Sequence, residues 1–161
     1  MIGNGRACLR FRIGSAGFEL PLESVEEIAA VERICPVPLA PTAVKGVATW
    51  RGRVVTLLDL ATLLGAAAPA RAASADRLAL ILMKPFEHLG LYLEGPVELS
   101  HEAVIRAALR AETFGEGSLA ILPGTGGDLP TEDRPTLISV PELVAGCERA
   151  VLQQFRRRTA P

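Results

Sequence analysis

The side chains that could carry catalytic or metal chemistry are few and scattered along the chain. Two histidines, His88 and His101, are well separated, and the three cysteines, Cys8, Cys35 and Cys147, include no Cys-x-x-Cys pair. Because zinc ligands usually come as short-spaced pairs, a metal site is not expected. We interpret the cysteines as small buried apolar side chains in a reducing compartment rather than as disulfide partners.

Signatures of nucleophilic and phosphate chemistry are also missing from the sequence. There is no Gly-x-Ser-x-Gly elbow, and the glycine-rich segment 124–127 lacks the Lys-Ser/Thr that completes a phosphate-binding loop. A catalytic role for Asp59 would need a partner acid or base, and none can be named. A carboxylate that caps the turn at 60–64 is favoured instead. The sequence therefore predicts no enzyme, no catalytic residue and no cofactor.

Arg51 is the residue best placed for recognition. It precedes Gly52, where the chain can turn with positive φ at no Cβ penalty. A guanidinium displayed on a turn of a rigid sheet can bind a partner. The alternative is a solvated charge, or a weak surface ion pair with a carboxylate such as Glu27. The neighbouring Trp50 could be a core residue or an exposed anchor, because Trp is enriched at binding hot spots.

These residues lie in the stretch 44–60, which has the pattern of two apolar strands broken by a turn. Its second half, from Val54 to Leu58, is nearly continuous in apolar residues, as in a strand buried on both faces. We predict that residues 44–59 form two adjacent strands of one barrel. Val55 and either Leu57 or Leu58 should be fully buried.

The preceding segment predicts a β-hairpin with strands at 8–13 and 18–22 and four loop residues, 14–17. Residues 23–31 are ambiguous, since their carboxylates and alanines favour helix. The three prolines within 35–42 rule out regular structure there.

The later segments alternate between short strands and polar loops. One helical turn is expected at 60–64, and the Ala-rich segment 65–76 is expected to be a mobile loop at the seam between two subdomains. Within 97–110, Ser100 could cap a helix that contains Val104, Ile105, Ala108 and Leu109, which fits a period of 3.6. Short strands are predicted at 78–83, 89–93, 119–122 and 136–138.

The chain closes with a predicted helix. Ser139 and Glu142 are spaced as a capping box, with Pro141 in the first turn. One apolar face is expected to cover the barrel, and the basic end at 156–158 is expected to be solvated. A membrane-surface or partner-binding tail is the alternative for this helix.

Composition limits the classes of partner. The 161 residues are 49% hydrophobic and 22% charged, which suits one packed domain. A net charge of −1 and 4% aromatic residues argue against nucleic acid binding. The N-terminal residues lack the apolar core of a signal peptide, and the apolar run 78–83 is too short to cross a bilayer. We expect a soluble, cytoplasmic protein without direct membrane insertion.

The central stretch resembles a known signature. Residues 46–60 read Gly-Val-x-x-x-Arg-Gly-x-Val-Val-x-x-x-Asp-Leu, which is similar to the CheW coupling domain of bacterial chemotaxis. Upstream, residues 11–22 resemble the opening hairpin of that family. Residues 25–28 resemble its Val-x-Glu-Ile element, and 34–38 its proline-containing run. The resemblance spans residues 9–65.

The resemblance implies a fold and a function. The expected fold is mainly β, with two small SH3-like or OB-like five-stranded β-barrel subdomains packed together and a C-terminal helix. It implies a strand after a short turn within 23–31 and mostly extended chain over 97–110, where periodicity favours helix. We expect a tail at 1–7, a single CheW-like domain at 8–148 with its seam near 65–76, and a basic helical tail at 149–161.

The implied function is a non-enzymatic signalling adaptor. Its partners would be the regulatory domain of a CheA-type histidine kinase and the cytoplasmic tip of a chemoreceptor, with self-association possible. In the family the arginine matching Arg51 lies at the surface that meets the receptor. Val25 could equally be core. The residues expected to bind a partner are Val25, Glu27, Gly46, Trp50, Arg51 and Gly52.

The chain also departs from the family pattern. Thr49 and Trp50 stand where Asn-Leu is usual, Thr56 where Pro is common, and Ala61 where Arg is common. Residues 93–97 replace a Val-Asp-x-Val element. These departures leave open a divergent stand-alone scaffold in a pilus, motility or other two-component pathway. An alternative from a different class is a small-ligand-binding or enzymatic barrel, which would need a polar pocket with perturbed pKa values.

Overall fold

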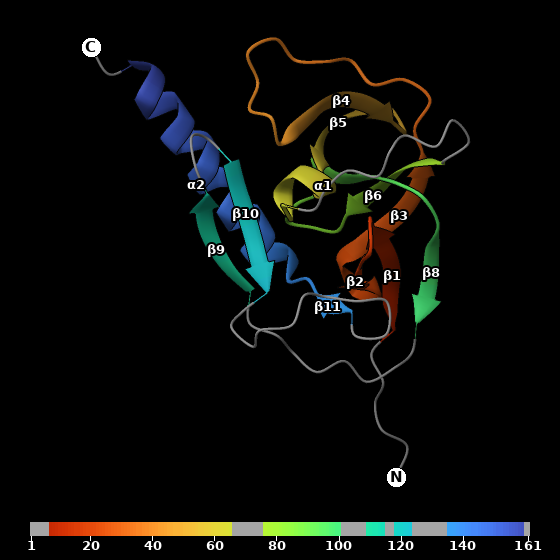
Figure 1. The fold of residues 1–161 in the computed structure, drawn as a ribbon. Coiled ribbons are helices and arrows are strands. Elements are labelled where there is room, and N and C mark those ends of the chain that lie inside the picture. Colours follow the sequence, from red (N-terminus) through yellow and green to blue (C-terminus); the bar gives the residue numbers. More distant parts are fainter. Residues whose placement is uncertain (1–6, 66–75, 101–108, 115–117, 124–134, 160–161) are drawn as a thin grey trace.

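The structure is a computed structural model that describes residues 7–65, 76–100, 109–114, 118–123 and 135–159. In this part of the chain the fold is mainly β, with a long helix near the C-terminal end (Figure 1). The loop expected to be mobile, 66–75, lies outside the described residues. The expected seam at 65–76 falls there too, apart from its two end residues.

The N-terminal hairpin seeds a four-stranded sheet. Strands β1 (Cys8–Ile13) and β2 (Ala16–Pro21) pair antiparallel up to Ile13 and Ala16, so the turn has two residues rather than the predicted four. Ala16 and Gly17 remain in the ladder, and Gly14 takes a φ of 62°. Strand β8 (Val97–Ser100) pairs with β1 and strand β11 (Thr136–Leu137) with β2, giving the order β11-β2-β1-β8.

The second sheet has five strands in the order β3-β6-β7-β5-β4. Its members are β3 (Val25–Ala30), β4 (Val44–Trp50), β5 (Arg53–Asp59), β6 (Arg77–Leu82) and β7 (Leu89–Glu94). The two strands predicted within 44–59 are confirmed, as are those predicted at 78–83 and 89–93. The strand expected after a short turn is also confirmed, because η1 (Leu22–Ser24) leads directly into β3.

The segment 97–110 is extended where it is described. Strand β8 occupies its start, and β9 (Leu109–Phe114) begins at its end. The helix that periodicity favoured would begin after its cap, Ser100, so β8 does not test it, whereas Leu109 at its other end lies in β9. The four residues of β8 pair with β1. Residues 101–108 lie outside the described part. Strand β10 (Ser118–Pro123), which contains the predicted strand at 119–122, pairs with β9.

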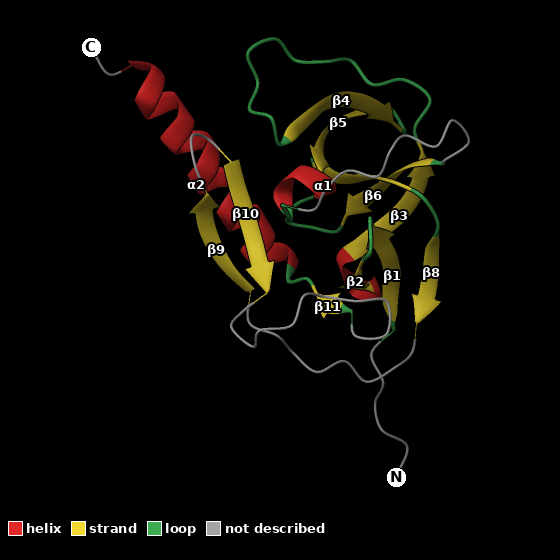
Figure 2. Ribbon diagram, in the orientation of Figure 1, coloured by secondary structure: helices red, strands yellow, loops and turns green. Residues whose placement is uncertain are grey.

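Two helices complete the fold (Figure 2). The predicted turn at 60–64 is confirmed as α1 (Leu60–Leu63), and the predicted C-terminal helix as α2 (Val140–Thr159). In Figure 1, α2 lies alongside the β9–β10 hairpin. Its predicted apolar face is buried at Val140, Leu143, Val144 and Cys147. No helix in the described part combines the length and apolarity needed to cross a bilayer.

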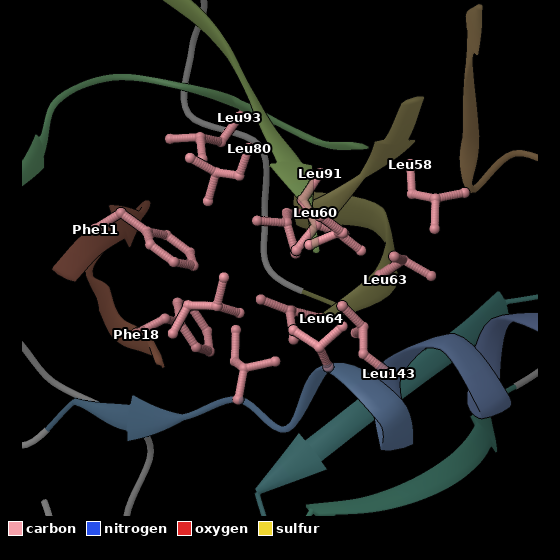
Figure 3. Close-up of a cluster of buried hydrophobic side chains, with 14 of the residues drawn as sticks. Phe11, Phe18, Leu58, Leu60, Leu63, Leu64, Leu80, Leu91, Leu93 and Leu143 are labelled. Atoms are coloured by element: carbon pink, nitrogen blue, oxygen red, sulfur yellow. The ribbon is translucent and has the colours of Figure 1, made fainter. Parts of the chain in front are cut away.

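Alternation along the central strands divides the core into two clusters. On β5, β6 and β7, one set of leucines joins the α1 and α2 side chains and the N-terminal hairpin in a larger cluster (Figure 3). The opposite faces form a smaller cluster of Val55, Leu57, Ala79, Ile81 and Tyr92. Val55 and Leu57 are fully buried and Leu58 nearly so, as predicted. Burial on both faces explains the near-continuous apolar run in this strand.

The mainly β, two-sheet fold with a C-terminal helix is confirmed, although the sheets are not two closed five-stranded barrels. One sheet has four strands, and the five-stranded sheet curls until the chain after β3 meets β4 at one bridge, Cys35 with Val47. Pro36 and Pro38 follow at once, and neither can donate a backbone hydrogen bond. Each sheet takes strands from both sides of the 66–75 loop.

Candidate functional site

The β4–β5 turn has the geometry of a tight hairpin. Trp50 pairs with Arg53, leaving a two-residue turn in which Arg51 has φ 45° and Gly52 has φ 76°. Positive φ at both central positions is the type I′ turn, whose twist matches that of the flanking strands. The predicted turn at Gly52 is thus confirmed. Arg51 is an unusual residue for its position, because a side chain in this region costs on the order of 1 kcal/mol.

Arg51 is held by two neighbours. Its Nη2 lies 2.5 Å from Oε2 of Glu27, and its guanidinium lies 4.9 Å from the centre of the Trp50 ring. The Arg51 side chain is 67% exposed and that of Glu27 is 34% exposed. The ion pair foreseen from the sequence therefore exists, at a surface where such pairs contribute little to stability. Exposure also leaves the guanidinium accessible to a partner.

A second ion pair runs beside the first. Arg53 donates from Nη2 to Oε2 of Glu26 at 3.1 Å, and its guanidinium lies 4.7 Å from the Trp50 ring centre. Neighbouring residues on a strand normally point to opposite faces. The β3 register shifts between Val25 and Glu27, and this bulge lets two consecutive glutamates reach the same turn.

We call Glu26, Glu27, Trp50, Arg51, Gly52 and Arg53 the turn cluster. Sequence reasoning singled out four of these residues and missed Glu26 and Arg53. The available signal was the pair of arginines flanking Gly52 together with two adjacent glutamates. What could not be read was the bulge, because it depends on the pairing of β3 with β6.

The other two expected site residues lie apart from this turn. Val25 is half-buried and packs against the larger core cluster. Gly46 is buried, with φ 150°, and a Cβ there would lie 2.5 Å from the Cys35 carbonyl oxygen. The close approach of residues 34–35 to β4 thus requires glycine. Val25 therefore contacts the core and Gly46 contacts the 34–35 segment, so both residues act in the packing of the fold.

Asp59 caps helix α1. Its Oδ1 accepts a hydrogen bond from the Ala61 backbone N–H at 3.2 Å, and its Oδ2 accepts one from the Thr62 hydroxyl at 3.1 Å. The capping role favoured from the sequence is confirmed.

The polar hollow that most resembles an active site is small. It measures about 80 Å³, well below the roughly 300 Å³ of typical ligand sites. Desolvation and a 2.6 Å hydrogen bond to Glu94 raise the pKa of Tyr92 to about 12. That shift keeps the phenol neutral and weakens it as an acid. The hollow is lined by Arg12, Lys45, Asp59, Tyr92 and Glu94, among others.

Metal and thiol chemistry find little support in the described residues. No three His, Cys, Asp or Glu side chains gather there as a metal ion would need. Cys8 and Cys147 are buried, Cys35 is exposed, and none forms a disulfide. Burial raises the pKa of the Cys147 thiol, which makes it less reactive. His101 lies outside the described part of the chain.

Comparison with known proteins defines the class. A family model described as the CheW-like domain matches residues 7–107, more than half of the chain. The chain therefore belongs to the CheW-like domain family, and the match extends well past the resemblance at 9–65.

A solved structure agrees with this assignment. The scaffolding protein TtCheW from Thermoanaerobacter tengcongensis superposes with a TM-score of 0.53 at 15% sequence identity. The alignment covers 75% of this chain and 90% of that one. At this identity the likeness establishes the fold. No curated protein matches the sequence.

Proposed function

We propose that this chain is a non-enzymatic adaptor of a chemotaxis-like pathway, joining a chemoreceptor to a CheA-type histidine kinase in the cytoplasm. Membership of the CheW-like domain family supports the adaptor class. The observation that carries the proposal is the turn cluster, where an exposed arginine is held in a strained turn between Trp50 and Glu27.

The turn cluster is suited to recognition for a physical reason. Strained backbone that persists at an exposed position needs support from its surroundings, and it is commonly found at functional sites. Arg51 engages Glu27 through Nη2, and its remaining donors have no partner among the described residues. A guanidinium in this state can donate two hydrogen bonds to a partner carboxylate, in a bidentate contact. Stacking on Trp50 limits the side-chain entropy lost on binding.

The six residues named from the sequence then divide into roles. Glu27, Trp50 and Arg51 would contact the partner, and Gly52 would allow the turn that presents them. Gly46 and Val25 would act indirectly, by fixing β4 and the start of β3. Glu26 and Arg53 join the contact set because they hold the other flank of the turn.

A capture experiment tests the proposal. The tagged chain is incubated with native lysate of its source organism, and bound proteins are identified by mass spectrometry. We expect a histidine kinase with a similar regulatory domain, a chemoreceptor, or both. Recovery of neither protein would overturn the proposal. Recovery of proteins of a pilus system would assign the adaptor to that pathway instead.

A variant pair then tests the site. Arg51→Ala should weaken binding to the purified kinase regulatory domain or receptor tip by about thirtyfold, the effect of losing roughly 2 kcal/mol. Arg149→Ala removes an exposed arginine on α2 and should change nothing. Equal affinities for wild type and both variants would remove Arg51 from the interface.

A further inference from the structure

The curled five-stranded sheet has an incomplete closure. Cys35 and Val47 exchange two backbone hydrogen bonds, of 2.8 and 2.9 Å. In an antiparallel ladder the next such pair lies two residues further along each chain, which here would be Arg33 with Thr49. Among the described residues neither makes that bridge, and the outward N–H and C=O of Thr49 have no backbone partner.

An apolar slot opens where this rung is missing. It has a volume of about 480 Å³, within the range of binding sites. β3 and its continuation form one wall, β4 forms the other, and β5 and β6 form the floor. The wall residues Ala29 and Ala48 are small, and the larger Val31 and Trp50 also line the slot and pack against its floor. The floor is Val55, Leu57, Ala79 and Ile81, which are buried beneath the walls.

The two ends of the slot differ. At one end the Cys35–Val47 bridge joins the walls through backbone. At the other end β3 and β4 are joined by the Glu27–Arg51 and Glu26–Arg53 ion pairs of the turn cluster. Exposed ion pairs are weak, so this second end opens at small cost.

We propose that the slot receives an extended segment of a partner protein, which adds to β4 as a further strand. The outward backbone groups of Thr49 would form a hydrogen-bonded pair with one residue of the segment. The segment's residues on either side of that one would then point inward, since alternate residues share a face. One inward position faces Ala48 above the apolar floor and accepts an aliphatic side chain.

The unused donors of two arginines select the other inward position. It lies beside Trp50, at the end of the slot where Arg51 and Arg53 each engage a glutamate through a single nitrogen, Nη2. Their remaining donors can bind a carboxylate on the incoming segment. The recognised pattern is therefore an aliphatic and an acidic residue two positions apart on an extended chain.

This inference goes beyond the proposed adaptor function and stands or fails separately from it. Docking of a folded receptor or kinase domain on the turn cluster requires no free strand edge. Conversely, a strand-forming segment could bind in the slot of a protein that couples no kinase.

A peptide titration followed by nuclear magnetic resonance tests the proposal. The probe is the blocked heptapeptide Thr-Glu-Thr-Leu-Thr-Glu-Thr, which has a glutamate two positions from leucine on each side. The control carries N-methyl groups on the two threonines flanking leucine, which keeps the side chains and removes backbone donors. We expect fast amide exchange at Thr49 in the free protein, slowed by the probe, and at least about tenfold weaker binding of the control.

Three outcomes would overturn the proposal. They are an amide of Thr49 that is already protected in the free protein, no binding of the probe, and equal binding of the two peptides. The last would mean that the slot takes apolar side chains without strand pairing.

A slot-filling variant provides an independent check. Ala48→Leu adds three carbons where the aliphatic side chain of the probe would sit, and it should weaken probe binding at least about tenfold. Ala40→Leu makes the same change outside the slot lining and should bind as wild type does. Melting temperatures confirm that both variants fold. Undiminished binding to a folded Ala48→Leu variant would place the probe elsewhere.

Discussion

At the residue scale, arginine is an unfavourable residue for the backbone conformation at position 51, but its side chain makes two stabilising contacts. Type I′ turns favour asparagine or glycine at this position, because both residues tolerate positive φ. The guanidinium nevertheless has Trp50 beneath it and Glu27 beside it. Stability alone would select a different residue here.

A comparison of three side chains separates folding from binding at Arg51. Arg51→Asn should stabilise the protein by up to about 1 kcal/mol, because asparagine suits the turn. Arg51→Ala should change stability by no more than about 0.5 kcal/mol, since the lost ion pair is exposed. Both should lose partner affinity. Urea unfolding and calorimetric titration measure the two effects. A large loss of stability in Arg51→Ala would instead make the ion pair structural.

At the element scale, β4 depends on two glycines for different reasons. Gly46 lies where a Cβ would clash with the Cys35 carbonyl, whereas a Cβ on Gly52 meets nothing within 4 Å. Both have positive φ. The first glycine therefore permits close packing, and the second only permits a backbone conformation.

Alanine substitutions should separate these roles. Gly52→Ala should cost about 1 kcal/mol from strain alone. Gly46→Ala should cost more, about 2–4 kcal/mol, because strain adds to displacement of the 34–35 segment from β4. Chemical unfolding gives both values. Equal costs would show that the 34–35 segment yields freely and that its approach to β4 contributes little.

The packing of helix α2 on the core depends on one face of the helix. Leu143 is fully buried in the larger core cluster, while Leu152 on the same helix is 59% exposed. Leu143→Ala should cost about 2–5 kcal/mol through lost burial and a cavity. Leu152→Ala should remain within about 0.5 kcal/mol. Urea denaturation of the two variants tests this. Similar small effects would mean that α2 docks loosely on the core.

Sequence reasoning succeeded where local pattern and tertiary packing agree. The strands within 44–59 were predictable because burial on both faces leaves a dense apolar run. The short hairpin loop was missed because Ala16 and Gly17, which resemble turn residues, continue the ladder. The helix favoured within 97–110 is contradicted at Leu109, which pairs with Pro123 in the β9–β10 ladder. In the candidate site, the pairing of Arg53 with Glu26 could not be predicted from the sequence, because it depends on a bulge in β3.

At the scale of the whole molecule, Tyr92 links folding to alkaline pH. Its pKa is about 12 in the folded protein against 10.0 for a free phenol. Because the folded state disfavours the ionised form, this contribution to stability is complete below pH 10 and is lost as pH rises towards 12.

Tyr92 is the single tyrosine of the chain, so its ionisation can be followed directly by absorbance. We expect a phenol titration near pH 12 in the native protein and near pH 10 in urea. Stability should fall more steeply over this interval in wild type than in Tyr92→Phe, which carries the same lysines. A native titration near pH 10 would contradict the desolvated hydrogen bond with Glu94.

The strand order also has a consequence for synthesis on the ribosome. β2 acquires its neighbour β11, and the larger core its Leu143, only when residues near position 140 have emerged from the exit tunnel. Until then Phe18 and Leu20 lack part of their cover, and long-range pairing of this kind forms slowly. The growing chain therefore passes through an interval in which apolar surface is open to solvent. Holdase chaperones would bind that surface during this interval.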